Sequence, residues 1–141
     1  MTHRFLLDTN TLSEPMKPKP NPGVLRRLEE LGEASCMAAP VWHELVYGAR
    51  LLPPSKKRQA IEQYLMDVVR TSFPILPYDE EAAEWHARER ARLSKLGAKP
   101  PIIDGQIAAI AKRNGLILVT ANRKDFERFE QLEIEDWMER G

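Results

Sequence analysis

The sequence predicts a single α/β domain built on a central parallel β-sheet with helices on both of its faces. Short apolar runs typical of buried strands alternate along the chain with stretches whose apolar residues recur at helical spacing. This alternation favours parallel strands joined by crossover helices. The chain has 141 residues, enough for one hydrophobic core and too few for two ordinary domains, so we expect one domain over residues 1–141.

The first strand and the first long helix are separated by a proline-rich loop. Residues 5–8 (FLLD) form an apolar run that ends in an acid, the pattern of a buried strand. Residues 15–23 contain four prolines and favour an extended, polyproline-like loop. Asn21 is the expected N-cap of a helix that starts at Pro22 and ends at Gly32. Its apolar face is expected to hold Leu25, Leu28 and Leu31.

Two further strands follow, with helices between them. Residues 34–40 (ASCMAAP) read as a second buried strand, and residues 41–51 have helical spacing. The next helix begins at the capping residue Ser55, and residues 74–78 (PILPY) are the third strand. The expected apolar stripe of that helix is Ile61, Leu65, Val68 and Val69.

The last part of the chain predicts the remaining helices and strands. Asp79 caps a helix with acids in its first turn and bases in its last, which suits the helix dipole. Residues 102–115 form another helix, and residues 116–120 (LILVT) form a plain apolar strand. A turn, a short helix at residues 125–132 and an edge strand near residues 132–137 complete the expected fold.

Composition excludes several classes of protein. No apolar run approaches the ~20 residues that span a bilayer, so no membrane role is expected. The N-terminus lacks a signal core, and the lone Cys36 cannot form an internal disulfide; both observations suit a cytoplasmic protein. The 21 basic and 21 acidic residues cancel, so binding to a polyanion would require local positive charge.

Four acids are expected at one edge of the sheet. Ligands of open parallel sheets bind beyond the carboxyl ends of the strands. Asp8 ends the first strand, Glu44 follows the second, and Asp125, with Asn122, follows the fourth. Asp104 precedes its strand and must reach this edge from the first turn of a crossover helix. Such a cluster needs a cation, and oxygen donors without a nearby cysteine or histidine pair suit one or two Mg²⁺ or Mn²⁺ ions.

Each acid also has a purely structural interpretation. Asp8 can be a turn residue or the cap of a short helix, and Asp125 can cap the helix after it. Glu44 can be a solvated helix residue, whereas Asp104 lies in an apolar stretch and must be capped, paired or liganded. The set is more informative than any one of its members.

Other polar residues are interpreted as structural. His43 and His86 are assigned to the surface or to packing, and Cys36 to the core. Arg123 and Lys124 would ordinarily be solvated, but they lie within the acidic turn and could contact phosphate.

Three segments carry a family resemblance that covers nearly the whole chain. They are FLLDTNTLSE at the start, HELVYGAR in the middle and IIDGQIAAIAKRNGLILVTANRKDFERF near the end. Each motif is weak alone, but D-T-N, E-L-x-x-G, D-x-x-I-A-A and L-V-T-x-N-x-x-D-F in this order are highly specific. The chain resembles PIN-domain ribonucleases of the VapC toxin type.

The resemblance implies a five-stranded parallel sheet in the order 3-2-1-4-5 and a set of catalytic, metal-binding acids. Carried over by position, these acids are Asp8, Glu44, Asp104 and Asp125, with Asn10, Thr120 and Asn122 in supporting polar positions. The resemblance also implies magnesium-dependent endonucleolytic cleavage of RNA, an antitoxin protein that inhibits it, and a homodimer. The expected mechanism is metal-assisted hydrolysis, in which no side chain is the nucleophile.

Two alternatives remain open at this point. A phosphatase could use Asp8 as a nucleophile, although the familiar arrangement places an acid two residues later, where this chain has Asn10. A catalytically silent module that binds RNA or a protein partner is the other, and the presence of all four acids argues against it.

Overall fold

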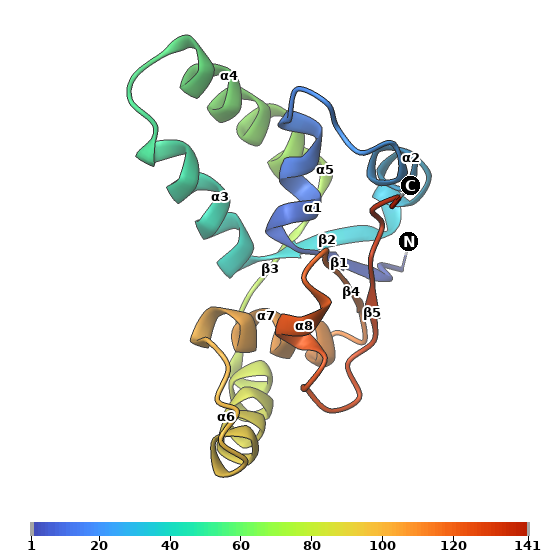
Figure 1. The fold of residues 1–141 in the computed structure, drawn as a ribbon, viewed down its shortest axis with the longest axis vertical. Helices are drawn as coiled ribbons and strands as arrows, with labels where there is room; N and C mark the ends of the chain where they lie inside the picture. Colours follow the sequence, from blue (N-terminus) through green and yellow to red (C-terminus); the bar gives the residue numbers. More distant parts are fainter. Residues whose placement is uncertain (1, 141) are drawn as a thin grey trace.

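A five-stranded parallel sheet in the order β3-β2-β1-β4-β5 forms the centre of the computed structural model, which describes residues 2–140 (Figure 1). The strands are β1 (Phe5–Leu7), β2 (Ser35–Ala38), β3 (Ile75–Leu76), β4 (Ile117–Val119) and β5 (Ile134–Glu135). The predicted α/β class and the sheet order implied by the resemblance are both confirmed. β1 is the central strand, and β4 pairs with it in parallel, Leu7 opposite Val119.

Helices cover both faces of the sheet (Figure 1). One face carries α1 (Thr9–Ser13), the 3₁₀ turn η1 (Glu14–Met16), α2 (Pro22–Leu31), the 3₁₀ turn η2 (Gly32–Ala34), α3 (Ala39–Leu51), α4 (Lys56–Tyr64), the π-helical segment η3 (Leu65–Val69) and α5 (Arg70–Ser72). The other face carries α6 (Glu80–Lys95), α7 (Ile102–Arg113) and α8 (Arg123–Phe126). Among residues 2–140, no helix has the length and apolar character needed to cross a membrane.

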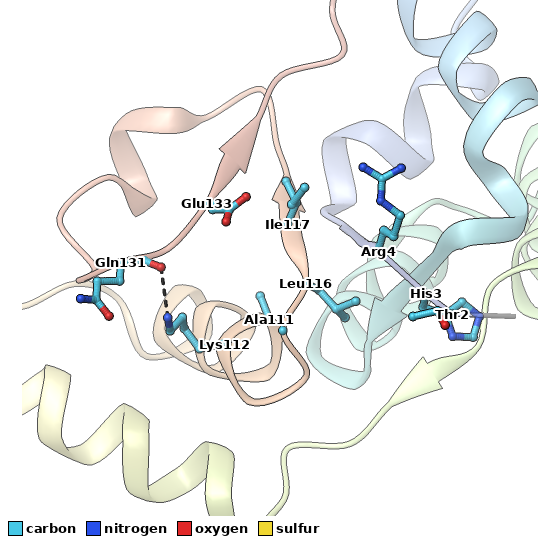
Figure 2. Close-up of a pocket in the computed structure, with 10 residues that line it drawn as sticks. Thr2, His3, Arg4, Ala111, Lys112, Leu116, Ile117, Gln131 and Glu133 are labelled. Carbon is cyan, nitrogen blue, oxygen red and sulfur yellow. Dashed lines mark hydrogen bonds between the residues drawn. The ribbon is translucent and has the colours of Figure 1, made fainter.

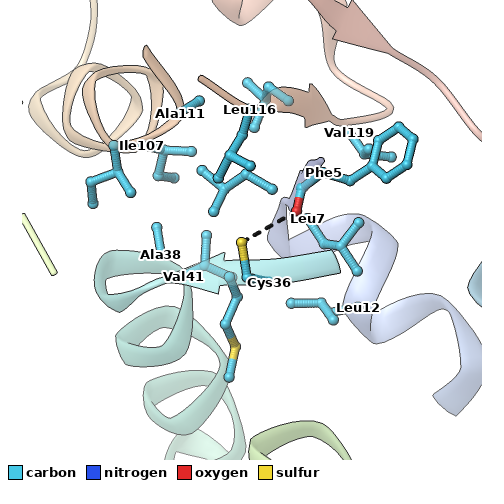
Figure 3. Close-up of a cluster of buried hydrophobic side chains, with 14 of the residues drawn as sticks. Phe5, Leu7, Leu12, Cys36, Ala38, Val41, Ile107, Ala111, Leu116 and Val119 are labelled. Atoms are coloured by element: carbon cyan, nitrogen blue, oxygen red, sulfur yellow. Dashed lines mark hydrogen bonds between the residues drawn. The ribbon is translucent and has the colours of Figure 1, made fainter. Parts of the chain in front are cut away.

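The core lies between the sheet and the inner faces of these helices (Figure 3). All three residues of β1 are buried, as a strand covered on both faces requires. Cys36 of β2 packs in this cluster, and its thiol donates a hydrogen bond to the carbonyl oxygen of Phe5 at 3.3 Å. Cys36 is therefore a core residue, as expected.

The inward face of α2 differs from the prediction by one position. Leu25 is 40% exposed, whereas Val24 is only 1% exposed. The difference arises because the first turn of α2 packs against the end of the chain. A Cβ atom on Gly23 would lie 2.7 Å from the carbonyl oxygen of Trp137. This contact turns Val24 inward, while Leu28 and Leu31 pack against the core as predicted.

The helix that begins at Lys56 does not keep a regular spacing to its end. Its chain widens into a five-residue π-helical segment over Leu65–Val69, where backbone hydrogen bonds join residues five apart. Leu65 and Val69 are buried, but Val68 is 43% exposed. The prediction that Val68 lies on the apolar stripe is wrong because it assumed an unbroken α-helical period.

Two loop predictions also need correction. The extended loop predicted for residues 15–23 is shorter, because η1 includes Pro15 and α2 includes Pro22 and Gly23. Glu14 is buried, and its carboxylate accepts a hydrogen bond from the Asn21 backbone at 2.8 Å, which closes the loop. The short helix predicted for residues 125–132 is wrong in its bounds: the helix observed is α8 (Arg123–Phe126), and turns follow it.

Candidate active site

Asp8 lies at the carboxyl end of β1 and is only 7% exposed. One carboxylate oxygen, Oδ1, accepts a hydrogen bond from the Thr9 backbone at 2.8 Å and so caps α1. The other, Oδ2, accepts from the Thr120 hydroxyl at 2.8 Å and from the Asn10 amide at 3.3 Å. The capping interpretation of Asp8 is therefore correct, and the same side chain also lines a cleft.

Thr120 ties the ends of β1 and β4 together. Its fully buried hydroxyl donates to Asp8 and accepts from the Asn10 amide at 3.3 Å and the Asn122 backbone at 3.0 Å. The side-chain oxygen of Asn10, Oδ1, accepts a hydrogen bond from the Ala121 backbone N–H at 3.0 Å. Because these donors and acceptors satisfy one another, the network fixes the position of the Asp8 carboxylate.

The four predicted acids line one cleft of about 360 Å³ at the carboxyl edge of the sheet. Glu44 comes from α3, and its carboxylate accepts from the Thr9 hydroxyl at 3.3 Å. Asp104 lies in the first turn of α7, and Asp125 lies inside α8. The full lining is Asp8, Thr9, Asn10, Ser13, Glu44, Asp104, Ile107, Asn122, Asp125 and Phe126.

Asp125 does not cap α8, because that helix already begins at Arg123. Asn122 takes the N-cap position, although its side chain makes no capping hydrogen bond. The capping interpretation of Asp125 is therefore wrong, and its exposed carboxylate borders the cleft instead.

Electrostatic repulsion couples the acids. Burial and then the charges of Asp125, Asp8 and Glu44 raise the pKa of Asp104 to about 6. Burial also raises the pKa of Asp8, although hydrogen bonds from Thr9, Thr120 and Asn10 oppose the shift. Among the residues that the structure describes, no lysine or arginine lines this cleft to neutralise the acids. The arrangement therefore favours a bound cation.

The cleft fits a hard divalent cation by the chemistry of its donors, which are carboxylate, amide and hydroxyl oxygens. Within residues 2–140, however, no three acidic, histidine or cysteine side chains come close enough to hold an ion as they stand. Asp8 is fixed by its hydrogen bonds, whereas Glu44, Asp104 and Asp125 are at least partly exposed. Closure around an ion would therefore fall to these three side chains.

Sequence reasoning missed two polar residues of the cleft. Thr9 and Ser13 both line it from α1. Their spacing of four residues places them on the same helix face, and this was the available signal once Asp8 is taken as the cap.

The histidines lie outside the cleft. His43 is exposed, and its ring stacks on Tyr47 at 5.9 Å between ring centroids. His86 is buried on α6, where its Nδ1 atom and the Tyr78 hydroxyl are 2.7 Å apart. Its ring packs so closely on α7 that a Cβ atom on Gly105 would overlap it. Both histidines are structural or surface residues, as expected.

A second cavity, of about 340 Å³, opens at the opposite, amino edge of the sheet (Figure 2). Its charged lining residues are Arg4, Lys112 and Glu133, with His3 beside them. It shares no residue with the acidic cleft.

Comparison with known proteins adds independent information. The PIN domain family matches residues 5–132. The "tRNA(fMet)-specific endonuclease VapC" of Salmonella typhimurium is 33% identical over 135 residues, which cover 95% of this chain and 98% of the relative. "Toxin FitB" of Neisseria gonorrhoeae is 35% identical over 125 residues, 86% of this chain and 90% of the relative. Among solved structures, DNA-bound VapBC from Salmonella typhimurium has a TM-score of 0.83 at 31% identity, covering 96% of this chain and 99% of that one.

Proposed function

This chain belongs to the PIN domain family, and we propose on that basis that it is a metal-dependent endoribonuclease that acts as the toxin of a toxin–antitoxin pair. Relatives that match most of its length are named as an endonuclease and as a toxin. The observation that carries the proposal is the cleft in which four acids gather without a neutralising base. A catalytically silent module would have no reason to keep a cluster that opposes folding.

We assign the metal site to the four acids. Asp8 and Asp104 are the central ligands, and Glu44 and Asp125 complete the site directly or through water. When bound, one or two Mg²⁺ or Mn²⁺ ions would supply an activated water and stabilise negative charge on the phosphate. The raised pKa of Asp104 supports this assignment, because burial and then the neighbouring acids disfavour its charged form, and a bound cation would favour it.

The remaining polar residues hold and orient these ligands. The Thr120 hydroxyl and the Asn10 amide both donate to Asp8 Oδ2, which fixes the carboxylate without neutralising it. Asn122 supports Thr120 through its backbone N–H. Thr9 donates to Glu44 and thereby links the start of α1 to α3. Ile107 and Phe126 supply the apolar wall that limits access of bulk water.

The partner we propose is a cognate antitoxin protein. Its docking surface is the apolar groove of about 270 Å³ between α1, α3 and α4, which adjoins the cleft at Glu44. Exposed apolar side chains continue this surface: Tyr47 and Leu51 on α3 are 57% and 66% exposed. A protein seated here would cover one flank of the cleft, and a solved structure similar to this chain is a DNA-bound VapBC complex.

We further propose that the PIN domain extends over residues 1–141 and that the protein forms a homodimer in the cytoplasm. Beyond the matched residues, Trp137 is buried against Phe5, with ring centroids 5.3 Å apart. The side-chain amide of Asn21 donates a hydrogen bond to the Glu139 backbone carbonyl and accepts one from the Glu139 backbone N–H, both of 2.9 Å. These contacts support counting the end of the chain as part of the domain.

Cleavage of total cellular RNA tests the proposal. The protein is co-expressed with its antitoxin, separated from it and incubated with RNA in EDTA, Mg²⁺ or Mn²⁺. We expect discrete cleavage products only with a divalent ion, and their loss when the antitoxin is added back. Equal cleavage in EDTA would contradict the metal requirement, and intact RNA under all conditions would contradict the nuclease assignment.

A further inference from the structure

The acidic cleft is flanked by two depressions of opposite chemistry. The apolar groove on the α3 side has Glu44 and Lys57 as its only charged lining residues. On the opposite side, a pocket of about 190 Å³ shares Asp125 with the cleft and contains the cations Lys124 and Arg128. We call this the Lys124 pocket. Its lining is Leu93, Ala98, Pro100, Pro101, Lys124, Asp125, Arg128 and Phe129.

The backbone that carries both cations is held firmly. Phe126 and Phe129, which flank Arg128, are buried and only 1% and 4% exposed. The Arg128 carbonyl oxygen accepts a hydrogen bond from the Arg92 guanidinium at 2.9 Å. Lys124 and Arg128 are therefore presented from a fixed segment, although their own side chains are exposed.

The other arginines of this region are occupied by protein groups. The Arg123 guanidinium donates to the Ile134 carbonyl oxygen at 3.0 Å. Arg92 forms two hydrogen bonds to the Glu89 carboxylate, of 2.8 and 2.9 Å. Within residues 2–140, neither Lys124 nor Arg128 forms an ion pair, so their charge stays available to a ligand.

We propose that the Lys124 pocket binds the nucleotide next to the bond that is cut. Its phosphate lies against Lys124 and Arg128, and its sugar or base lies against the apolar wall of Pro100 and Pro101. This inference rests on the proposed function, because it names the path of the RNA into the same cleft.

The charge distribution is the physical reason for this path. A protein without net positive charge must attract a polyanion locally. The cleft itself is acidic and repels phosphate until cations fill it, and the α3-side groove is apolar. The Lys124 pocket combines net positive charge with an apolar wall, a combination that suits single-stranded RNA, whereas Lys57 in the α3-side groove is balanced by Glu44. Arg123, which the sequence placed beside Lys124 in the acidic turn, donates to the Ile134 carbonyl oxygen and does not line the pocket.

The test compares Lys124→Gln, Arg128→Gln and the double variant with Arg123→Gln, a neighbouring control with the same change in charge. Fluorescence anisotropy in the Asp8→Asn background measures binding of an RNA oligonucleotide that the wild type cleaves, over a range of KCl concentrations. The slope of log K against log salt is negative, and its magnitude should fall by about 0.7 for each phosphate contact removed. The double variant should reduce the magnitude by about 1.4. Arg123→Gln should keep the wild-type slope.

Cleavage kinetics with Asp8 restored provide the second readout. The double variant should raise KM by about tenfold with little change in kcat, because it weakens binding and leaves the acids intact. An unchanged slope and KM in an active double variant would overturn the pocket and leave the nuclease assignment standing. A wild type that cleaves no RNA would overturn both. Weaker antitoxin binding with unchanged RNA binding would show that the Lys124 pocket binds an acidic protein segment and not a nucleotide.

Discussion

The two edges of the same sheet carry cavities of nearly equal size and different electrostatics. The cleft at the carboxyl edge has a volume of about 360 Å³, and the cavity at the amino edge has about 340 Å³. At the amino edge, Lys112 donates to the Gln131 carbonyl oxygen at 3.1 Å (Figure 2). The Arg4 guanidinium carbon lies 4.9 Å from the centre of the Phe5 ring. Acids and bases are mixed there, because Arg4, Lys112 and Glu133 all line the cavity.

At the carboxyl edge, the acids gather without a base, and burial together with mutual repulsion raises the pKa of Asp104 to about 6. Such an arrangement costs folding free energy, which a cation would return. The difference teaches that cavity volume does not distinguish the two edges, whereas unbalanced charge held by a fixed network does. On that ground we propose the carboxyl edge as the functional site.

The sharpest way to break this comparison is to remove one acid from each edge. Asp8→Asn should lower RNA cleavage by at least about 100-fold. Loss of a group that only orients a metal ligand lowers activity by up to about 100-fold, and loss of the ligand itself should cost at least as much. The fold of the variant should remain intact, and slightly more stable without metal, because a buried and repelled charge is gone. Glu133→Gln should leave cleavage unchanged. Initial rates with purified proteins, and chemical unfolding in EDTA, measure both effects.

Full cleavage by Asp8→Asn would contradict the assignment of this carboxylate. An equal loss of cleavage in Glu133→Gln would instead indicate that the reaction takes place at the amino edge. A contaminating nuclease is detected by residual cleavage that the antitoxin fails to inhibit.

The glycines at the two ends of α7 offer a second test. Gly105 lies beside Asp104, and a Cβ atom there would overlap the His86 ring and approach its Cδ2 atom to 2.6 Å. Gly105→Ala should therefore destabilise the protein by about 1–3 kcal/mol through overpacking. It should also lower cleavage, because α7 carries Asp104. Gly115 has open space around it but a φ of +65°, so Gly115→Ala should cost about 1 kcal/mol without affecting cleavage.

Chemical unfolding of combined variants separates the two mechanisms. His86→Ala makes room for the new methyl group, so His86→Ala with Gly105→Ala should cost less than the sum of the single changes. The combination of His86→Ala with Gly115→Ala should be additive. Additivity at both glycines would show that the His86 contact does not position α7.

Local patterns were sufficient to predict the strands and the edge where polar residues gather. Asp8 directly follows an apolar run, so its position at the carboxyl edge could be inferred from β1 alone. Asp104 was harder, because its reach depends on where α7 begins relative to the sheet. The sheet order that settles this was implied by the resemblance and not by residue spacing.

The errors arose where distant contacts decide the local structure. Val24, and not Leu25, faces inward because the end of the chain packs on α2. Val68 is exposed because the helix widens into a π-helical turn that no local period indicates. The role of Thr9 depends on Glu44, 35 residues away, and the role of Arg123 on β5.

The smallest expected effect is the pH dependence of stability that the acidic edge produces. The folded pKa of Asp104 is raised to about 6 from an ordinary 3.8, so in metal-free protein its favourable contribution is fully present below pH 3.8 and is lost as pH rises through 6. His86 acts in the opposite direction, because burial lowers its pKa and its contribution is lost as pH falls below its ordinary 6.5. Comparing the wild type with Asp104→Asn therefore separates the contribution of Asp104 to the pH dependence from that of His86.

Between pH 7 and pH 5, the free energy of unfolding of the metal-free wild type should rise by about 1 kcal/mol relative to Asp104→Asn, a modest value because Asp104 is only partly buried and water screens its charge. Urea unfolding in EDTA at both pH values measures this difference. Saturating Mg²⁺ should stabilise the wild type at pH 7 and have little effect on Asp104→Asn. Equal pH dependence in the two proteins would show that burial and repulsion at the carboxyl edge perturb Asp104 too weakly to distinguish this edge from the amino edge.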